Sequence, residues 1–441
     1  MLLNPEKNRE IDKWVKDVVD KTIIKTNKIL FNDMKNWSFI DQREIVHSSK
    51  NFFQIQGLEV STNSGNINNW HQPIINQSEI GILGIIKKKF EGKYYYLLQA
   101  KIEPGNINKV QISPTVQATK SNYKQVHKGS KPLFVEYFLN ERKKIILDQL
   151  QSEQGGRFLQ KRNRNIIIEI EKNIEYPENY KWFTLEEIKT LIRKNNFINM
   201  DTRSVIAGIN VNKERKILGI VTEQQNSIHS MVEVLSWLTE QKAKYYIQVE
   251  KLSLSELNKW VVTESQIHHV NNKYFKVIAV NTEIQNREVM EWSQPMIQSI
   301  TPGIIAFVVK RINGIIHFIV QAKIEVGNLD IIELAPTLQC MTGDYRDTKS
   351  GDLPFLDLVL EVSKKHIIYD TMQSEEGGRF YREENRNLII QVDEDFDIKL
   401  PDRYIWMTYE QLHDFMIFNN YLNIQARSLL SAIRECSSEI S

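Results

Sequence analysis

Two ionisable side chains, Lys101 and Glu103, stand two residues apart in the segment Gln-Ala-Lys-Ile-Glu. On a strand both would point to one face, because successive side chains alternate. A lysine and a glutamate side by side could bind a sugar diphosphate and serve as a base, and the same pair can also be a plain structural ion pair. Lys323 and Glu325 repeat the pattern, which does not decide between the two interpretations, because structure and function are copied together.

A short polar loop after an apolar stretch offers hydroxyls, an amide, an ammonium and a phenol. It could wrap a base, a ribose or a diphosphate, or be a turn without function. The equivalent segment further along keeps a tyrosine, Tyr345, but has no lysine, and His127 after the first loop has no histidine counterpart. The loop consists of Thr119, Lys120, Ser121, Asn122 and Tyr123.

A local basic cluster follows, and it could hold an anionic ligand or be a solvated face. Its later counterpart has Arg379 and Arg386, but Glu383 and Glu384 replace two of the cations. The cluster contains Arg157, Lys161, Arg162 and Arg164.

Two tryptophans, Trp37 and Trp260, occupy matching places in the chain. Core packing is the ordinary role of so large a side chain, and a stacking plate for a nucleobase is the functional alternative.

Composition narrows the class of ligand. The formal net charge is +2, which argues against a general binder of nucleic-acid backbones. There is no Gly-x-Gly-x-x-Gly or phosphate-loop motif, no metal-ligand spacing and no nucleophile elbow, so we expect no cofactor and no metal. Cys340 and Cys436 cannot form a disulfide framework, and no segment resembles a signal peptide or a membrane span, so we expect a cytoplasmic protein.

An internal repeat organises these candidates. An offset of 222 residues aligns Trp70 with Trp292 and runs without a gap to Asn165 and Asn387, with about a third of the positions identical. We therefore expect two duplicated domains, 1–208 and 209–441, with the boundary near residues 207–225.

The elements expected in each copy are the same, and the fold class they predict is α+β. Alternation and turn residues predict strands, including hairpins around Glu91-Gly92 and Asn313-Gly314. Thr184 and Glu187 fit a capping box at the start of a helix. The expected helices are 11–26, 184–193, 227–241 and 408–418; the expected strands are 52–60, 81–88, 93–102, 144–149, 165–170, 274–280, 303–310, 315–324, 366–372 and 387–392.

Several long segments resemble the NDP-hexose 2,3-dehydratases of deoxysugar biosynthesis. In the first copy these are Trp70–Gln77, Gln99–Asn106, Ser113–Tyr123, Val126–Gly129, Gln151–Phe158 and Lys161–Asn165; in the second they are Gln321–Asn328, Pro336–Cys340, Gln373–Tyr381 and Leu422–Leu430. The resemblance implies two Nudix-related domains in a homodimer. It also implies removal of the C3 proton and the C2 hydroxyl from dTDP-4-keto-6-deoxy-D-glucose, with a 3-ketoreductase acting on the product.

The family presents two nucleotide-sugar pockets, and the resemblance implies the following residues. The acid–base candidates of the first pocket, which we expect to be the productive one, are His71, Lys101, Glu103, Tyr123 and His127. Its substrate-binding candidates are Trp37, Gln117, Thr119, Lys120, Ser121, Asn122, Tyr123, Arg157, Asn163, Arg164, Asn165 and Arg203. The second, remnant pocket would use Trp260, Lys323, Glu325, Tyr345, Arg379, Arg386, Asn387, Gln425, Ala426, Arg427 and Ser428.

The first copy keeps cationic and titratable groups that the second copy lacks, which favours the first pocket. Two alternatives stay open: a non-catalytic nucleotide-sugar-binding scaffold, and a metal-dependent Nudix hydrolase. The missing Nudix metal box disfavours the latter.

Overall fold

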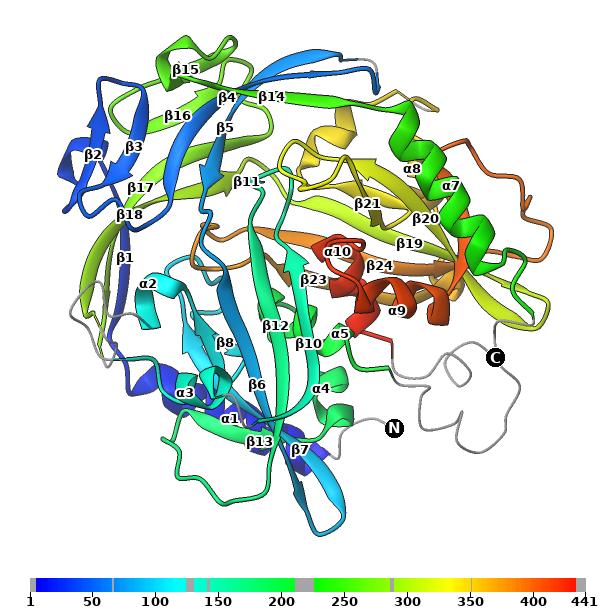
Figure 1. The fold of residues 1–441 in the computed structure, drawn as a ribbon. Coiled ribbons are helices and arrows are strands. Elements are labelled where there is room, and N and C mark those ends of the chain that lie inside the picture. Colours follow the sequence, from blue (N-terminus) through cyan, green and yellow to red (C-terminus); the bar gives the residue numbers. More distant parts are fainter. Residues whose placement is uncertain are drawn as a thin grey trace.

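The computed structural model describes residues 5–65, 67–123, 131–140, 143–210, 226–285, 289–349 and 351–433. Helices and mixed sheets alternate along the chain, which confirms the expected α+β class. The described strands form two large sheets of seven strands and two smaller ones (Figure 1).

Each large sheet is built from one repeat, and the two share the same strand plan. The central strands of each sheet pair in parallel, whereas the flanking pairs are antiparallel. In spatial order the first sheet contains β10 (Lys144–Ser152), β12 (Arg162–Ile170), β6 (Gly81–Phe90), β7 (Lys93–Ile102) and β13 (Tyr180–Phe183), with β8 (Val110–Ser113) on β7 and β9 (Val116–Ala118) on β6. The second contains β21 (Ile332–Ala335), β20 (Ile315–Ile324), β19 (Gly303–Ile312), β24 (Glu384–Gln391) and β23 (Ile367–Ser374), with β22 (Leu338–Cys340) on β19 and β25 (Tyr404–Thr408) on β20.

The two predicted hairpins are confirmed. Glu91 and Gly92 have φ of 45° and 84°, and Asn313 and Gly314 have φ of 52° and 81°. Two consecutive positive φ values are what a two-residue hairpin turn needs to match the twist of its strands.

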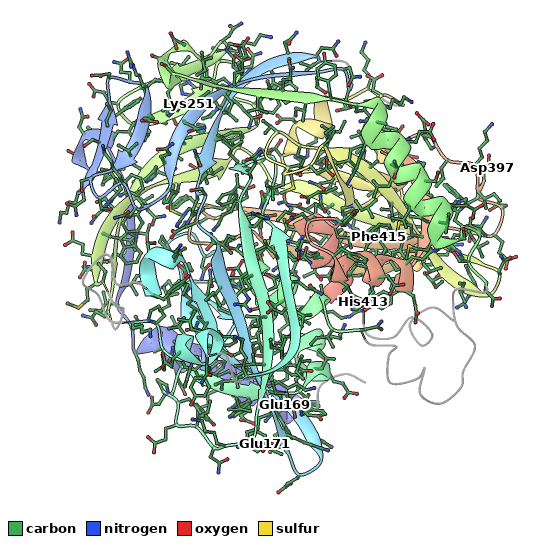
Figure 2. The ribbon with its side chains drawn as sticks, in the orientation of Figure 1. Glu169, Glu171, Lys251, Asp397, His413 and Phe415 are labelled. Carbon is green, nitrogen blue, oxygen red and sulfur yellow. The ribbon has the colours of Figure 1, made fainter. Side chains whose placement is uncertain are left out.

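The smaller sheets exchange strands between the repeats. β1 (Ile24–Ile29) of the first repeat pairs with β17 (Phe275–Ile284) of the second, and β14 (Ile247–Leu252) of the second pairs with β4 (Gln54–Thr62) of the first (Figure 1). Lys251 of β14, labelled in Figure 2, also forms an ion pair of 2.7 Å with Glu44. The remaining strands are β2 (Trp37–Ile40), β3 (Glu44–His47), β5 (Asn69–Asn76), β11 (Phe158–Leu159), β15 (Trp260–Val262), β16 (Gln266–His269) and β18 (Glu291–Ser299).

The helices lie mostly where the sequence predicts them. The capping box at Thr184 is present, and Ser230 and Thr408 form two more. The first helix ends at Asp20, six residues before its predicted end, because β1 begins at Ile24 and joins the other repeat. The helices are α1 (Pro5–Asp20), α2 (Lys120–Tyr123), α3 (Val135–Leu139), α4 (Leu185–Leu191), α5 (Met200–Ala207), α7 (Met231–Lys244), α8 (Leu356–Leu360), α9 (Tyr409–Ile417) and α10 (Ile424–Ser431). Short 3-10 turns cover η1 (Phe31–Asp33), η3 (Leu254–Glu256), η4 (Gly343–Asp347) and η5 (Lys364–His366).

Two buried arginines tie the repeats together reciprocally. Arg203 on α5 donates from Nε to Ser428 Oγ (2.8 Å), and Arg427 on α10 donates from Nε to Ser204 Oγ (2.9 Å). Arg203 also donates to Ser374 O at 2.8 Å, and Arg427 donates to Ser152 O. The helices α5 and α10 pack on one another between the two large sheets (Figure 1).

The contacts at the ends of these two helices follow the same reciprocity. Lys189 of α4 donates to Ser431 O near the end of α10 (3.4 Å), and Nε2 of His413 on α9, labelled in Figure 2, lies 3.0 Å from Gly208 O after α5. Both contacts bring a polar donor to otherwise orphaned helix carbonyls.

The main hydrophobic core is continuous across the repeats. It joins Leu83 and Ile167 of the first sheet to Phe307 and Val320 of the second. The domain boundary at 208/209 remains a proposal, since residues 211–225 lie outside the described part. None of the helices described for this chain is long and apolar enough to cross a membrane.

Candidate functional site

Lys101 and Glu103 form an ion pair on β7. Lys101 Nζ lies 2.7 Å from Glu103 Oε1, and both side chains are largely but not fully buried. The alternation of the strand puts them on one face. Burial strengthens their attraction relative to that of a surface pair.

The other wall of this site comes from the second repeat. Gly105 N donates to Gly377 O (2.8 Å), and Arg382 N donates to Gly105 O (2.9 Å). The contact is close: a Cβ added to Gly377 would lie 2.9 Å from Glu103 Cβ and 2.1 Å from Asn106 Oδ1. The glycine therefore permits the two repeats to approach at this point. We call the group Lys101, Glu103, Gln117, Asp201, Glu376 and Arg379 the first cluster.

The same arrangement recurs with the roles of the repeats exchanged. Gly327 N donates to Gly155 O at 2.7 Å, and a Cβ on Gly155 would lie 2.9 Å from Glu325 Cβ. Both clusters are therefore built from both repeats. The second cluster contains Lys323, Glu325, Gln339, Gln425, Gln154 and Arg157.

Glu376 is held in the first cluster by two donors to the same oxygen. Its Oε1 accepts from Gly378 N at 2.7 Å and from Gln117 Nε2 at 3.3 Å. Burial, and then the nearby Glu103 carboxylate, raise the pKa of Glu376, and Arg379 opposes this rise.

Asp201 lies in the first turn of α5, two residues after the N-cap Asn199. Its side chain is 2% exposed, and Oδ1 has no hydrogen-bond partner among the described residues. Burial and the carboxylates of Glu376 and Glu153 raise the pKa of Asp201 well above its usual range. Burial therefore favours the protonated forms of Glu376 and Asp201.

A buried carboxyl and a buried amine lie behind the cluster. Glu153 accepts from Asn163 Nδ2 at 2.8 Å, and burial together with Glu376 raises the pKa of Glu153 to about 7. Burial lowers the pKa of Lys161 to about 8. Both groups therefore titrate near neutral pH.

Arg379 supplies a cation at the edge of the first cluster. Its guanidinium lies 4.0 Å over the ring of Phe53, and Nε donates to Gln77 Oε1 at 3.3 Å. Arg157 has the mirrored place in the second cluster, 4.1 Å over the ring of Phe275.

This placement differs from the grouping that the sequence predicts for the two arginines. The sequence-based prediction puts Arg157 in the first pocket and Arg379 in the second, because each stands in that repeat. The loop that carries each arginine crosses to the other repeat's Lys-x-Glu strand, so Arg379 belongs to the first cluster and Arg157 to the second.

The two clusters differ in charge at three matching positions. Glu376 and Asp201 of the first correspond to Gln154 and Gln425 of the second, and Lys161, behind the first cluster, corresponds to Glu383. The clusters also differ in access. Gln117, Glu376 and Arg379 are partly exposed, whereas Gln339, Gln154 and Arg157 are only 7%, 3% and 8% exposed. The first cluster is the more titratable and the more open.

The polar segment predicted as a loop starts as a short helix, α2, beside the first cluster. Ser121 donates to Glu79 from both N (2.8 Å) and Oγ (3.0 Å), and Thr119 Oγ1 lies 2.8 Å from Ser121 Oγ. Burial raises the pKa of the Tyr123 phenol, and the Glu79 carboxylate adds to the rise. Lys120 is exposed, and the side chain of Asn122 lies outside the described residues, as does His127.

Three other predicted residues lie on strands of the two smaller sheets. His71 Nδ1 accepts from Asn258 N at 2.9 Å, on strand β5. Trp37 is 8% exposed and packs against Phe53, the ring that carries Arg379, and Trp260 packs in the same way against Phe275. A contact between either tryptophan and a nucleobase stays a prediction.

The remaining predicted residues make structural contacts. Arg164 and Arg386 form two-point ion pairs with Asp148 and Asp370, and Arg203 and Arg427 lie in the reciprocal contact between the repeats. Asn165 donates to Ser204, Asn387 donates to Asn385 O, the backbone N of Ala426 donates to Asn423, Ser428 accepts from Arg203, and the Tyr345 ring lies under Arg346. Gln425 is buried, and neither amide atom has a hydrogen-bond partner among the described residues.

Sequence reasoning missed Glu376, Asp201, Glu153 and Glu79. The sequence did contain a signal for Glu376. The matching segments 151–158 and 373–380 differ at one position, where the first has Gln154 and the second has Glu376. Within the described ranges, no three His, Cys, Asp or Glu side chains are arranged to hold a metal ion.

Comparison with known proteins decides the family. The sequence model for NDP-hexose 2,3-dehydratase matches residues 8–209 and again residues 231–433. The chain belongs to the NDP-hexose 2,3-dehydratase family. The two matches confirm the expected tandem repeat, and the family resemblance of the motifs is confirmed with it.

Three relatives in this dehydratase family share the name dTDP-4-dehydro-6-deoxy-alpha-D-glucopyranose 2,3-dehydratase. The protein from Saccharopolyspora spinosa is 42% identical over 95% of this chain and 90% of its own length. Those from Amycolatopsis orientalis and Streptomyces violaceoruber are 37% and 39% identical, over 98% and 91% of this chain and 91% of each relative.

Proposed function

We propose that the protein is a hydro-lyase that removes water across C2 and C3 of dTDP-4-keto-6-deoxy-D-glucose. Three relatives named for this reaction, at 37–42% identity over almost the whole chain, support the substrate. The observation that carries the site is the Lys101–Glu103 ion pair facing Glu376. The second cluster has an amide, Gln154, at the position of Glu376.

The chemistry follows from the C4 ketone, which acidifies the hydrogen on C3. Loss of that proton and of the C2 hydroxyl forms a C2–C3 double bond that carries the C3 hydroxyl. This enol becomes the 3,4-diketo-2,6-dideoxy sugar when C2 gains a proton and the C3 hydroxyl loses one. The reaction needs a base, a proton donor for the departing hydroxyl and positive charge near the enolate.

Lys101 and Glu103 provide two of these functions. The ammonium 2.7 Å from Glu103 favours the ionised carboxylate, which is the form that accepts the C3 proton. The same ammonium, close to the reacting atoms, stabilises negative charge that develops on the ketone oxygen. The expected acid–base pool is thereby narrowed, and His71 and His127 are not needed for this step.

The nucleotide end of the substrate carries a diphosphate, for which Arg379 is the available counter-ion. Its guanidinium lies at the edge of the cluster over Phe53. The hydroxyls of Thr119 and Ser121 lie 2.8 Å apart, Ser121 also donates to Glu79, and both hydroxyls can bind sugar or phosphate oxygens. Arg157 takes the equivalent role only in the second cluster, which we propose is a non-productive nucleotide-sugar site.

A single assay tests the proposal. Purified protein is mixed with dTDP-4-keto-6-deoxyglucose in D2O, and the sugar is followed by NMR for deuterium at C3, loss of the C2 hydroxyl and release of dTDP from the unstable diketone. Tight binding with neither exchange nor loss supports the scaffold alternative. Magnesium-dependent release of dTMP and sugar phosphate supports the hydrolase alternative.

Other features remain predictions of the family resemblance. These are the Nudix-like character of the two repeats, the homodimer, the 3-ketoreductase that consumes the product, and the cytoplasmic location. Gel filtration with light scattering tests the homodimer directly.

A further inference from the structure

One position distinguishes two otherwise identical eight-residue segments. The first repeat has Gln-Ser-Glu-Gln-Gly-Gly-Arg-Phe at 151–158, and the second has Gln-Ser-Glu-Glu-Gly-Gly-Arg-Phe at 373–380. Gln154 and Glu376 therefore occupy equivalent backbone positions, and the difference between them is confined to an amide against a carboxyl group.

Each of these side chains lies in the cluster of the opposite repeat. Glu376 faces the Lys101–Glu103 strand and is partly exposed, whereas Gln154 is 3% exposed and donates to Glu375 within the interior. The carboxyl group therefore lies in the cluster that is open to a ligand.

A second exchange of the same kind accompanies the first. Asp201 of the first cluster corresponds to Gln425 of the second, and both side chains are buried in the first turns of equivalent helices. The first cluster thus has two carboxyl groups at places where the second has two amides. Two neighbouring carboxyl groups in a buried setting resist double ionisation, so the pair retains a proton that single, solvated carboxyl groups lose.

The geometry leaves Glu376 one oxygen for this proton. Gly378 N and Gln117 Nε2 both donate to Oε1, and among the described residues we find no hydrogen bond to Oε2. Gln117 is itself held by Asn199 Nδ2 at 3.3 Å, and Asn199 caps the helix that carries Asp201. The carboxyl group is thus oriented by both repeats before any ligand arrives.

We propose that Glu376, supplied by the second repeat, is the catalytic proton donor to the departing C2 hydroxyl at the first cluster. This inference rests on the proposed dehydratase function. In the step, Glu103 first takes the C3 proton, and the C3–H electron pair passes into an enolate whose negative charge lies on the C4 oxygen. That electron pair then returns, which restores the C4 carbonyl and forms the C2–C3 double bond. The C2–O bond breaks with its electron pair, and that oxygen takes the Glu376 proton and leaves as water.

The groups that face Glu376 make its protonation dependent on pH. Lys101 and Arg379 favour its carboxylate, and Glu103, Asp201 and Glu153 disfavour it. Burial also disfavours the carboxylate and is the largest of these effects, so the pKa of Glu376 is raised on balance. Ionisation of the donor is therefore expected to lower the elimination rate at alkaline pH.

The test uses Glu376→Gln in the full chain, which makes the first cluster resemble the second at this position. We expect elimination to fall by about 10²- to 10⁴-fold, the usual contribution of a general acid. Because Glu103 remains, the variant in D2O should still place deuterium at C3 of unreacted substrate. Glu376→Asp, which keeps the carboxyl group, should recover part of the elimination. Its elimination rate should still fall at alkaline pH, whereas the rate of Glu376→Gln should show no such fall.

Controls separate this inference from the proposed function and from misfolding. Glu291→Gln, a matched change in an exposed ion pair with Lys35, should leave elimination unchanged. If the unmodified protein neither exchanges C3 nor eliminates, the proposed function fails. If it does both, and Glu376→Gln eliminates at the same rate or loses C3 exchange together with elimination while retaining its melting temperature, the donor role of Glu376 is overturned.

Discussion

Gln117 of the first repeat donates a hydrogen bond of 3.3 Å to Glu376 of the second. The equivalent Gln339 donates instead to Glu325 of its own repeat, at 3.2 Å. The two repeats therefore have a glutamine at the same position, but its hydrogen-bond partner differs. The Gln117 amide thus reaches a carboxyl group of the other repeat, whereas the Gln339 amide reaches one of its own, and this asymmetry underlies the account of the site.

The contact between the repeats predicts a severe effect of Gly105→Ala. A Cβ there would lie 1.7 Å from Phe380 O, which belongs to the backbone and cannot rotate away. We expect a loss of about 1–3 kcal/mol in the free energy of unfolding, measured by urea denaturation. Gly156→Ala, whose nearest neighbour is Glu325 Oε1 at 3.5 Å, should change stability by less than about 0.5 kcal/mol. Equal effects of the two changes would contradict the close approach.

The reciprocal arginines predict that the repeats unfold together. Arg203→Met removes the hydrogen bonds to Ser428 Oγ and Ser374 O and leaves buried acceptors unpaired. We expect a loss of about 2–4 kcal/mol in the free energy of unfolding, within a single urea transition. A double-mutant cycle with Ser428→Ala should give a coupling of about 1–2 kcal/mol. Two separate transitions in the unmodified protein would show that the repeats are independent.

Replacing the buried Glu333 with glutamine is expected to increase stability in a pH-dependent way. Its carboxyl accepts from Ser152 Oγ at 2.6 Å, and burial raises its pKa from 4.5 to about 7. The folded state therefore binds more protons than the unfolded state between about pH 4.5 and 7, so stability falls as pH rises through that window. At pH 8 the penalty is at most about 3 kcal/mol by that shift.

Glu333→Gln removes the titration and should stabilise the protein at pH 8 but not at pH 4.5. The first repeat already has an amide at this position, Gln111, which donates to Ser374 Oγ at 2.7 Å. The same substitution at Glu178, an exposed carboxylate paired with Lys21, should show no gain at pH 8. The prediction is wrong if Glu333→Gln is equally or less stable than the unmodified protein at both pH values.

Arg379 predicts a change in substrate affinity. Arg379→Met removes the cation over Phe53, so KM should rise about 10- to 100-fold with a smaller change in kcat, as expected for a lost charged hydrogen bond. Arg157→Met, in the second cluster, should change KM less than about threefold. A larger effect at Arg157 would reverse the assignment of the two arginines.

Local patterns predicted much of each repeat. Alternation and turn residues predicted strands β6, β7, β19 and β20, and the Thr184–Glu187 spacing predicted the start of α4. These signals reside in a few neighbouring residues, so they can be read without the tertiary structure.

The composite nature of the site could not be predicted in this way. The pairing of β1 with β17, and the crossing of the loop that carries Arg379, depend on contacts between residues more than 200 positions apart. A repeat aligned with itself shows which positions correspond but not which copy completes which site. The Gln154–Glu376 difference was visible, yet its meaning depends on where the loop lies.

The most direct test of the central claim compares matched double variants of the two clusters. Lys101→Ala with Tyr123→Phe changes the first, and Lys323→Ala with Tyr345→Phe changes the second. Turnover of dTDP-4-keto-6-deoxyglucose is measured for both, with melting temperatures as the control for folding. We expect the first pair to abolish turnover and the second to retain it. Loss of turnover in the second pair alone would contradict the claim that the first cluster is the productive site.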